Sequence, residues 1–314
     1  MDRQEQPSQV YDDEIDLREL FAVLWSGKKL ILAITACFAL FAVMYALSLP
    51  NQYKASTTLV PAQNDGGGLS GALGQLGGLA SLAGVSIGGG ESSEAQVAQQ
   101  IMLSRSFIED FVRQNDLAVE VFAAQGWDRD SNQLKVDGSL FNTETNQWVR
   151  EPPPGKQAEP SGWELYGAFK GMLSVAEDKK TGMVTVSVEY YSPEIAKQWV
   201  DKVVAAINTH MQSRKLERVN RNITYLEKQV EKTAIADMKE VFYTIIEEQI
   251  KNKMLAKASP EYAFVTVSPA MVPEEKTQPK RALICILGTL LGGMLSVLLV
   301  LVRHYAIAKP RETM

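Results

Sequence analysis

Two uncharged apolar runs, Leu30–Leu49 and Ala282–Val302, lie near the two ends of this 314-residue chain. Each contains at least 20 residues without an acidic, basic or histidine side chain, and a helix of that length spans roughly 30 Å of hydrocarbon. The alternative, a pair of buried core helices, is disfavoured because core helices rarely run so far without a polar face. We therefore predict two membrane spans.

Basic residues predict the orientation of these spans. Residues 1–29 and 303–314 carry Arg18, Lys28, Lys29 and Arg303 beside the runs, as cytoplasmic tails do. Residues 30–49 and 282–302 are then transmembrane, and residues 50–281 face outward. A cleaved signal peptide is the alternative for the first run, but its leader would hold seven acidic against four basic residues.

The composition of the outward segment restricts its chemistry. Both cysteines, Cys37 and Cys285, lie inside the runs, so no disulfide or thiolate metal site is expected outside them. Residues 50–281 contain 25 basic and 29 acidic side chains, which gives no general attraction to nucleic acid.

Candidate enzyme sites are poor. The two histidines, His210 and His304, have no partner at metal-ligand spacing. The run Asp128-Arg129-Asp130 imitates a metal-binding DxD, but no nucleotide-binding βαβ pattern surrounds it, and a phosphate-binding GxxxxGK[ST] loop is absent from the sequence. The tails are too short for a kinase or output module. We expect no catalytic, metal-binding or cofactor-binding residue, and hence a protein that is not an enzyme.

Residues 66–90 contain eleven glycines in 25 positions. Glycine at this density costs too much backbone entropy for a stable helix. A flexible linker explains the glycines but not the interleaved leucines, so an apolar loop against the membrane or a neighbouring subunit is the competing interpretation.

Periodicity predicts a mixed α and β fold for the rest of the outward segment. Tyr53–Val60 and Tyr262–Val267 read as strands that leave one span and enter the other, so we expect them to pair. Further strands are predicted at Leu173–Ala176 and Met183–Tyr190. Helices are predicted at Glu94–Asn115 and Trp163–Met172, and Trp127–Gly162 reads as a loop or short hairpin rather than core.

A long helical arm is predicted at residues 193–256, because the helix start Ser192-Pro193 is followed by 66 residues without proline. Beyond His210 an apolar stripe repeats at 3-4-3-4 spacing, as in a coiled coil, and we predict it to be an oligomer seam. A second amphipathic segment can fold back after a break near Thr233. The stripe consists of Leu216, Val219, Ile223, Leu226 and Val230.

The approach to the second span is rich in proline and ends in two basic residues. We expect this segment to fix the direction of the chain beside the membrane. Within the span, closely spaced glycines permit close helix contact, either with alanines of the first span or with a partner protein. The residues are Pro269, Pro273, Pro279, Lys280 and Arg281 for the approach, and Gly288, Gly292 and Gly293 for the span.

The order of these features resembles a known family. Four features in this order look like the polysaccharide co-polymerases, and within them the Wzz-type O-antigen chain-length determinants. They are Asp13-Glu14-Ile15-Asp16-Leu17 with Leu20, Trp25 and Lys28 before the first span, the Gly/Leu loop, the arm, and the run from Pro269 to Gly292. The likeness covers nearly the whole chain, and the proline spacing before the second span is less dense than in the family pattern.

The resemblance implies a two-span protein of the bacterial inner membrane with an α+β fold: a membrane-proximal α/β periplasmic base and a long helical arm. It implies a homo-oligomer whose partners are the O-antigen polymerase, undecaprenyl-linked glycan and membrane lipid. The implied function is to regulate the modal length of lipopolysaccharide O-antigen. The competing function is a periplasmic adaptor of an export system, which also pairs an anchor with a helical hairpin. A sensor of a periplasmic ligand is a third reading, disfavoured by the missing output domain.

Overall fold

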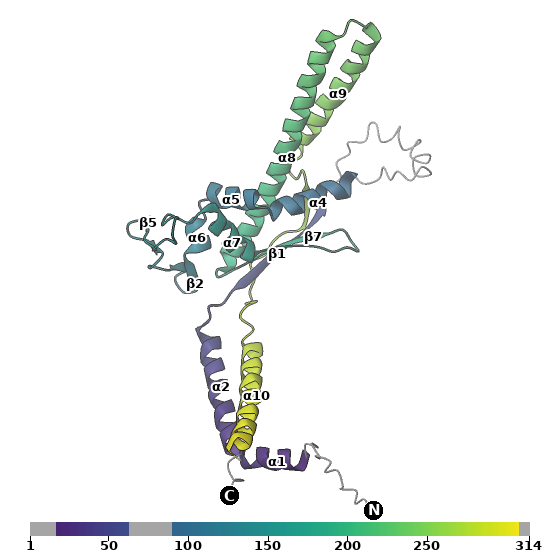
Figure 1. The fold of residues 1–314 in the computed structure, drawn as a ribbon. Coiled ribbons are helices and arrows are strands. Elements are labelled where there is room, and N and C mark those ends of the chain that lie inside the picture. The colour runs from purple at the N-terminus through teal and green to yellow at the C-terminus, as the bar shows by residue number, and fades with distance from the viewer. Residues whose placement is uncertain (1–16, 63–89, 308–314) are drawn as a thin grey trace, which may run out of the picture. The chain divides into compact units, whose positions relative to one another are not determined.

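The computed structural model describes residues 17–62 and 90–307. The chain divides into two compact units: a span unit, Met1–Leu49 with Gln278–Met314, and a central unit, Pro50–Thr277. The predicted α+β class is confirmed (Figure 1). The predicted glycine-rich loop falls, up to residue 89, outside the described residues.

The span unit consists of three helices, α1 (Leu17–Ser26), α2 (Lys28–Ser48) and α10 (Arg281–Ile307). α2 and α10 pack side by side and are long and apolar enough to cross a membrane. Only 11% of the most apolar stretch of α2 and 17% of that of α10 are buried. This exposure argues against the alternative of buried core helices.

A four-stranded antiparallel sheet with the order β6-β7-β1-β8 forms the base of the central unit. The predicted pairing of the two strands nearest the spans is confirmed, because Leu59 lies opposite Thr266 and Val60 opposite Val265. Beyond the pair, the N–H of Thr277 donates to the carbonyl of Gln52 at 2.8 Å. The strands are β1 (Tyr53–Pro61), β6 (Leu173–Glu177), β7 (Val184–Tyr190) and β8 (Phe264–Ser268).

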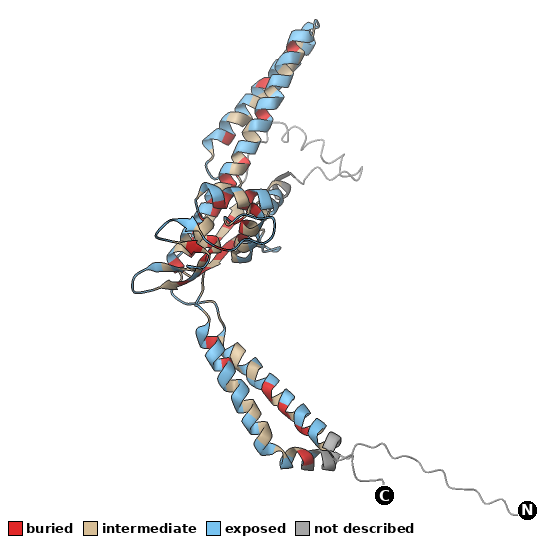
Figure 2. Ribbon diagram, turned by 60° about the vertical axis from the view of Figure 1, so that its left-hand side comes forward, coloured by how far each residue is buried: buried red, intermediate tan, exposed pale blue. Residues whose placement is uncertain are grey.

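Alternation along β1 and β7 separates a buried face of the sheet from a polar one. Leu59, Val186 and Val188 are fully buried. On the opposite face the hydroxyl of Ser56 donates to that of Ser187 at 3.0 Å. The buried face packs against the first half of α8 (Pro193–Lys232), and Figure 2 shows buried residues gathered there. Trp199 is the largest fully buried side chain.

Four further helices lie around this core, and side-chain hydrogen bonds cap the N-termini of two of them. The single helix predicted at Glu94–Asn115 is wrong: Ser104 caps a second helix by accepting from the N–H of Phe107, so the segment splits into two. The predicted helix at Trp163–Met172 is confirmed and begins at a capping box of Ser161 and Glu164. The helices are α4 (Gly90–Met102), α5 (Arg105–Gln114), α6 (Ala118–Phe122) and α7 (Gly162–Met172).

The polar stretch before α7 was predicted to be a loop or a short hairpin, and it forms two short hairpins. Two residues of this stretch are nevertheless buried, Phe141 at 6% and Arg150 at 8% exposed, although neither is part of the hydrophobic core cluster of the central unit. The strands are β2 (Ala124–Asp128), β3 (Gln133–Val136), β4 (Phe141–Asn142) and β5 (Gln147–Trp148).

The arm is a helical hairpin of α8 and α9 (Ala236–Ala258). The predicted start and break are confirmed, because Ser192 caps α8 and Thr233 ends it. The 40 residues of α8 correspond to about 60 Å of helix. One continuous helix thus belongs to the core through its first half and to the arm through its second (Figure 1).

Candidate functional site

Small residues every four positions bring α10 against α2. A Cβ at Gly288 would lie 2.5 Å from the Cβ of Ala42, and one at Gly292 would lie 2.5 Å from the Cβ of Phe38. One turn further, the hydroxyls of Ser296 and Thr35 are 3.4 Å apart. The absence of side chains at the two glycines therefore permits a close antiparallel helix pair.

The predicted span glycines thus have different surroundings. Packing of Gly288 against an alanine of the first span agrees with one of the two predicted uses, whereas Gly292 meets Phe38. A Cβ at Gly293 would meet nothing within 4 Å. The face formed by Gly288 and Gly292 is occupied by α2 of the same chain, and a polymerase contact in this span remains a prediction.

The stripe predicted as an oligomer seam faces α9 of the same chain. Val219 is 3% and Val230 is 8% exposed, while Leu216, Ile223 and Leu226 are partly exposed. At the base of the hairpin, the side-chain amide of Gln212 donates to the carbonyls of Ala256 and Ser259 at 2.9 and 3.0 Å. Val219 and Val230 are thus buried within the chain, whereas an oligomer seam along the partly exposed remainder of the stripe stays a prediction.

The outward surface of α9 carries apolar side chains that remain exposed among the described residues of the central unit. They form two rows that flank the face packed on α8, one row on each side. Exposed apolar rows of this length mark surfaces that bind other proteins or membranes. The rows are Met238, Val241 and Ile245, and Tyr243, Ile250 and Met254, with exposed fractions between 36% and 67%.

The predicted proline-rich approach is divided between the units. Pro269 and Pro273 follow β8 in the central unit, whereas Pro279 and Lys280 precede α10, which begins at Arg281. Ala270, between the prolines, is part of the hydrophobic core of the central unit. The start of the approach is thus fixed by packing.

Asn208 joins the arm helix to the strand that leads into this approach. Its side-chain oxygen accepts from the N–H groups of Ala263 and Phe264 at 2.8 and 2.9 Å, and its amide donates to the carbonyl of Phe264 at 2.9 Å. Asn208 is 3% exposed. One buried side chain therefore satisfies three backbone groups of β8 and its N-terminal flank.

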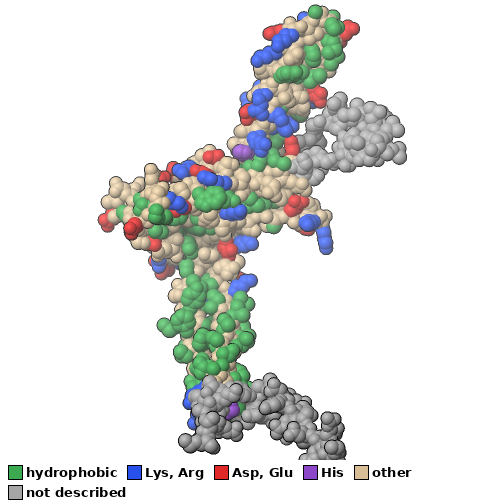
Figure 3. Space-filling model, viewed as in Figure 1, with side chains coloured by type: hydrophobic (Ala, Val, Ile, Leu, Met, Phe, Trp, Pro, Cys, Tyr) green, Lys and Arg blue, Asp and Glu red, His purple; other side chains and the backbone are tan. Residues whose placement is uncertain are grey.

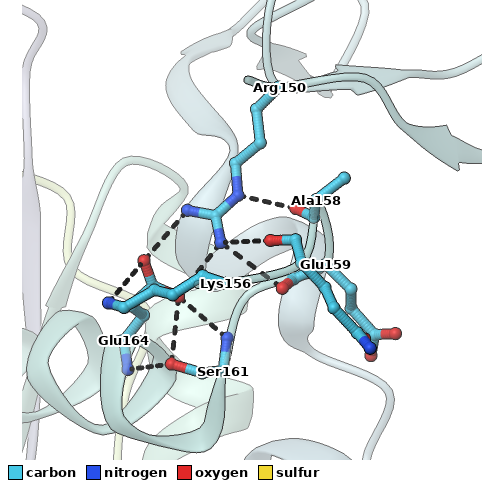
Figure 4. A network of polar contacts seen from close by, with 7 residues as sticks. Arg150, Lys156, Ala158, Glu159, Ser161 and Glu164 are labelled. Carbon is cyan, nitrogen blue, oxygen red and sulfur yellow. Dashed lines mark hydrogen bonds and ion pairs between the residues drawn. The ribbon is translucent and has the colours of Figure 1, made fainter. Parts of the chain in front are cut away.

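A second buried polar network fixes the loop between β5 and α7 (Figure 4). The guanidinium of Arg150 donates to both carboxylate oxygens of Glu164, at 3.1 and 3.0 Å, and to three carbonyls of residues 157–159. Glu164 also accepts from the N–H of Ser161 at 2.9 Å. The Arg150 guanidinium, followed by the N–H and the hydroxyl of Ser161, holds the pKa of Glu164 well below its usual range.

This network predicts an acid-sensitive contribution to stability. Because the pKa of Glu164 is lower in the folded than in the unfolded chain, its contribution is complete above the unfolded value of about 4.3 and is lost as pH falls below it. We expect Glu164→Gln to reduce the free energy of unfolding by about 3 kcal/mol at pH 7. The deficit should shrink as pH falls below about 4, measured by denaturant unfolding of the full chain in detergent. Glu151→Gln, at an exposed neighbouring position, is the control, and a deficit independent of pH would contradict the assignment.

The residues considered for metal binding are not brought together. His210 lies edge-on to Phe107, with ring centroids 5.9 Å apart, and burial lowers the pKa of its imidazole. Asp128 accepts from the N–H of Asp130 at 3.0 Å, which is a turn interaction. In the described part of the chain, no group of three or more histidine, cysteine or acidic residues could hold a metal ion.

A basic cluster lies at the base of the arm, where Figure 3 shows Lys and Arg side chains next to the body of the central unit. Arg214, Lys215, Arg218 and Arg221 line a cavity of about 370 Å³ together with Glu94, Val97, Met211 and Tyr262. Glu94 pairs with Arg218 at 3.3 Å. Four basic side chains against one acidic one give this cavity a positive charge, a feature that the helical periodicity alone does not reveal.

Two family models match parts of the chain. Residues 13–115 match the model described as chain length determinant protein, named Wzz, and residues 236–305 match the G-rich domain on putative tyrosine kinase. The first match spans α1, α2, β1, α4 and α5, and the second spans α9, β8 and most of α10. No curated protein matches the chain.

Solved structures of polysaccharide co-polymerases are similar at low identity. A full-length bacterial polysaccharide co-polymerase is 16% identical with a TM-score of 0.39, covering 96% of this chain and 100% of its own. A fragment of WzzB, the polysaccharide co-polymerase from Salmonella Typhimurium, is 13% identical with a TM-score of 0.30, covering 73% of this chain and 100% of its own.

Proposed function

From the Wzz-family region at residues 13–115, we propose that this chain determines the length of a polysaccharide, and specifically the modal length of lipopolysaccharide O-antigen. It acts as an oligomeric membrane scaffold, through the geometry of its subunits. The family match is the observation that carries the proposal. It is supported by two candidate spans that enclose an α/β unit with a helical arm.

The proposed location is the bacterial inner membrane, with both termini cytoplasmic and residues 50–281 periplasmic. The basic residues beside the spans support this orientation. The partners are further copies of the chain, the O-antigen polymerase and undecaprenyl-linked glycan. The basic cluster at the base of the arm offers hydrogen-bond donors to glycan hydroxyls and carboxylates.

The test is the banding of lipopolysaccharide on a gel, from cells without the chain and from cells in which it is restored. We expect an unregulated distribution of O-antigen lengths without the chain and a narrow modal band with it. Identical banding in both strains would contradict the O-antigen function.

The second family match favours a second candidate function. The G-rich region at residues 236–305 is described from putative tyrosine kinases, so length control of another exported polysaccharide, such as capsule or exopolysaccharide, is the alternative. Unchanged lipopolysaccharide banding with altered size of the capsular polysaccharide in the same two strains would favour it.

Assembly through the outward surface of α9 gives a further prediction. Val241→Glu with Ile245→Glu places two charges in one exposed apolar row, so we expect the mass in mild detergent, measured by light scattering, to fall from that of a large homo-oligomer towards that of a monomer. Thr244→Glu, at an exposed polar position of the same helix, should retain the oligomer. A parent protein of monomeric mass would contradict the scaffold.

Action through geometry also predicts which residues are dispensable. Alanine at His210, Asp128 or Asp130 should leave the modal length unchanged, since these side chains do not form a catalytic cluster. Loss of all long chains in one of these variants, with the protein still folded and inserted, would instead support an enzyme.

A further inference from the structure

A cavity of about 530 Å³ lies in the span unit, at the end of the helix pair where α1 joins α2. It falls within the range of about 300–1,000 Å³ that is typical of ligand sites. Residues of α1, of the turn after it, of α2 and of α10 line it. They are Val23, Ser26, Gly27, Lys29, Leu30, Val300, Arg303 and His304.

One wall of this cavity is formed where α10 packs closely against a glycine. A Cβ at Gly27 would lie 2.6 Å from Val300, so glycine allows α10 to approach the turn between α1 and α2. The N–H of Gly27 donates to the carbonyl of Val23, and the carbonyl of Gly27 accepts from Leu30 and Ile31. The turn is therefore hydrogen-bonded on both sides and lets α1 lie across the end of the helix pair (Figure 1).

The lining combines positive charge with apolar surface. Lys29 and Arg303 are its charged members, and none of the described residues that line it is acidic. Val23, Leu30 and Val300 supply apolar walls. A ligand that matches both parts carries a negative charge next to a hydrocarbon segment.

The neighbouring helix α1 has the composition of a helix at a membrane surface. Phe21 and Trp25 are 64% and 62% exposed, and the Lys28 ammonium lies 4.5 Å from the centre of the Trp25 ring. Exposed aromatic side chains beside lysine are typical of the headgroup region, where the ring enters the boundary and the charge meets lipid phosphate.

We propose that this cavity binds the phosphate of an anionic phospholipid, with Lys29 and Arg303 as donors and the acyl chains against Val23, Leu30 and Val300. Guanidinium and ammonium groups form charge-assisted hydrogen bonds with phosphate oxygens, and basic pockets between spanning helices at the cytoplasmic end are suited to such lipids. The bound lipid bridges α1, α2 and α10. This inference does not depend on which polysaccharide the chain regulates.

The experiment is native mass spectrometry of the full-length protein in detergent, titrated with dioleoylphosphatidylglycerol or with dioleoylphosphatidylcholine. We expect saturable binding of the anionic lipid alone. Lys29→Gln with Arg303→Gln should weaken it about thirtyfold, the change expected on loss of two basic contacts near a charged surface. The charge-conserving pair Lys29→Arg with Arg303→Lys should retain binding, and circular dichroism verifies that each variant is folded.

The matched control is Lys276→Gln with Lys280→Gln, which removes the same charge from exposed positions outside the lining and should leave binding within about twofold of the parent. Equal binding of the two lipids, or equal loss in the control and the cavity variant, would overturn the proposal. Displacement of the lipid by millimolar inorganic phosphate would also overturn it, because the site would then be one for free phosphate.

Discussion

Leucine in place of Gly288 or Gly292 is expected to separate α2 from α10 and to shift the polysaccharide towards short, unregulated chains. A Cβ at either position already lies 2.5 Å from the Cβ of Ala42 or Phe38, and neither of these atoms is the free end of a flexible side chain. The helices must therefore move apart, at a cost of about 1–3 kcal/mol. The central unit should keep its fold, because the change lies outside it.

A cysteine cross-link measures this separation independently of function. In a background of Cys37→Ser and Cys285→Ser, Thr35→Cys with Ser296→Cys should form a disulfide, since the native hydroxyls are 3.4 Å apart. Gly288→Leu or Gly292→Leu should abolish it, whereas Gly293→Leu should not, because a side chain there meets nothing within 4 Å. Parental modal length in both variants despite a lost cross-link would show that the helix pair does not control length.

Replacement of Asn208 by leucine is expected to destabilise the central unit by about 3–5 kcal/mol. Leucine has a similar size but no polar atoms, so two N–H groups and one carbonyl near the start of β8 would lose their partners. A buried backbone group without a partner costs about 1–3 kcal/mol. In this variant the contact between α8 and β8 should unfold before the rest of the sheet does.

Denaturant unfolding of the full chain in detergent, followed by tryptophan fluorescence, measures this change. Trp199 lies in the core on the same helix and reports on its packing. Asn222→Leu, at an exposed position further along α8, should change the free energy of unfolding by less than about 0.5 kcal/mol. A similarly small change for Asn208→Leu would show that its three hydrogen bonds are replaced by water.

Features with a strong local signal could be predicted from the sequence. The uncharged runs correspond to α2 and α10, and alternation along Met183–Tyr190 predicted β7, because the period of two reflects one buried face of a sheet. The capped start at Ser192 and the break at Thr233 depend on neighbouring residues only. Such patterns need no knowledge of the tertiary structure.

Features that depend on distant partners could not be predicted. Nothing adjacent to Asn208 marks it as buried, since its partners lie 55 and 56 residues further along the chain. The partners of Arg150 are nearer, at residues 157–164, but they surround it only once the loop between β5 and α7 has folded. The split between α4 and α5 was missed because one helical period runs through both. The stripe from Leu216 to Val230 has the spacing of a coiled coil, but spacing cannot distinguish a partner in another copy from the returning helix α9.

The pairing of β1 with β8 also determines how the central unit bears mechanical force. Both strands continue into the span unit from the same end of the pair. A force that separates the chain before β1 from the chain after β8 breaks the hydrogen bonds between the two strands one after another, beginning with the bond between Thr277 and Gln52. A pull on β1 along its own axis shears seven residue pairs with β7 at once. We therefore expect the two connections to separate sideways more easily than β1 slips along its own axis against β7.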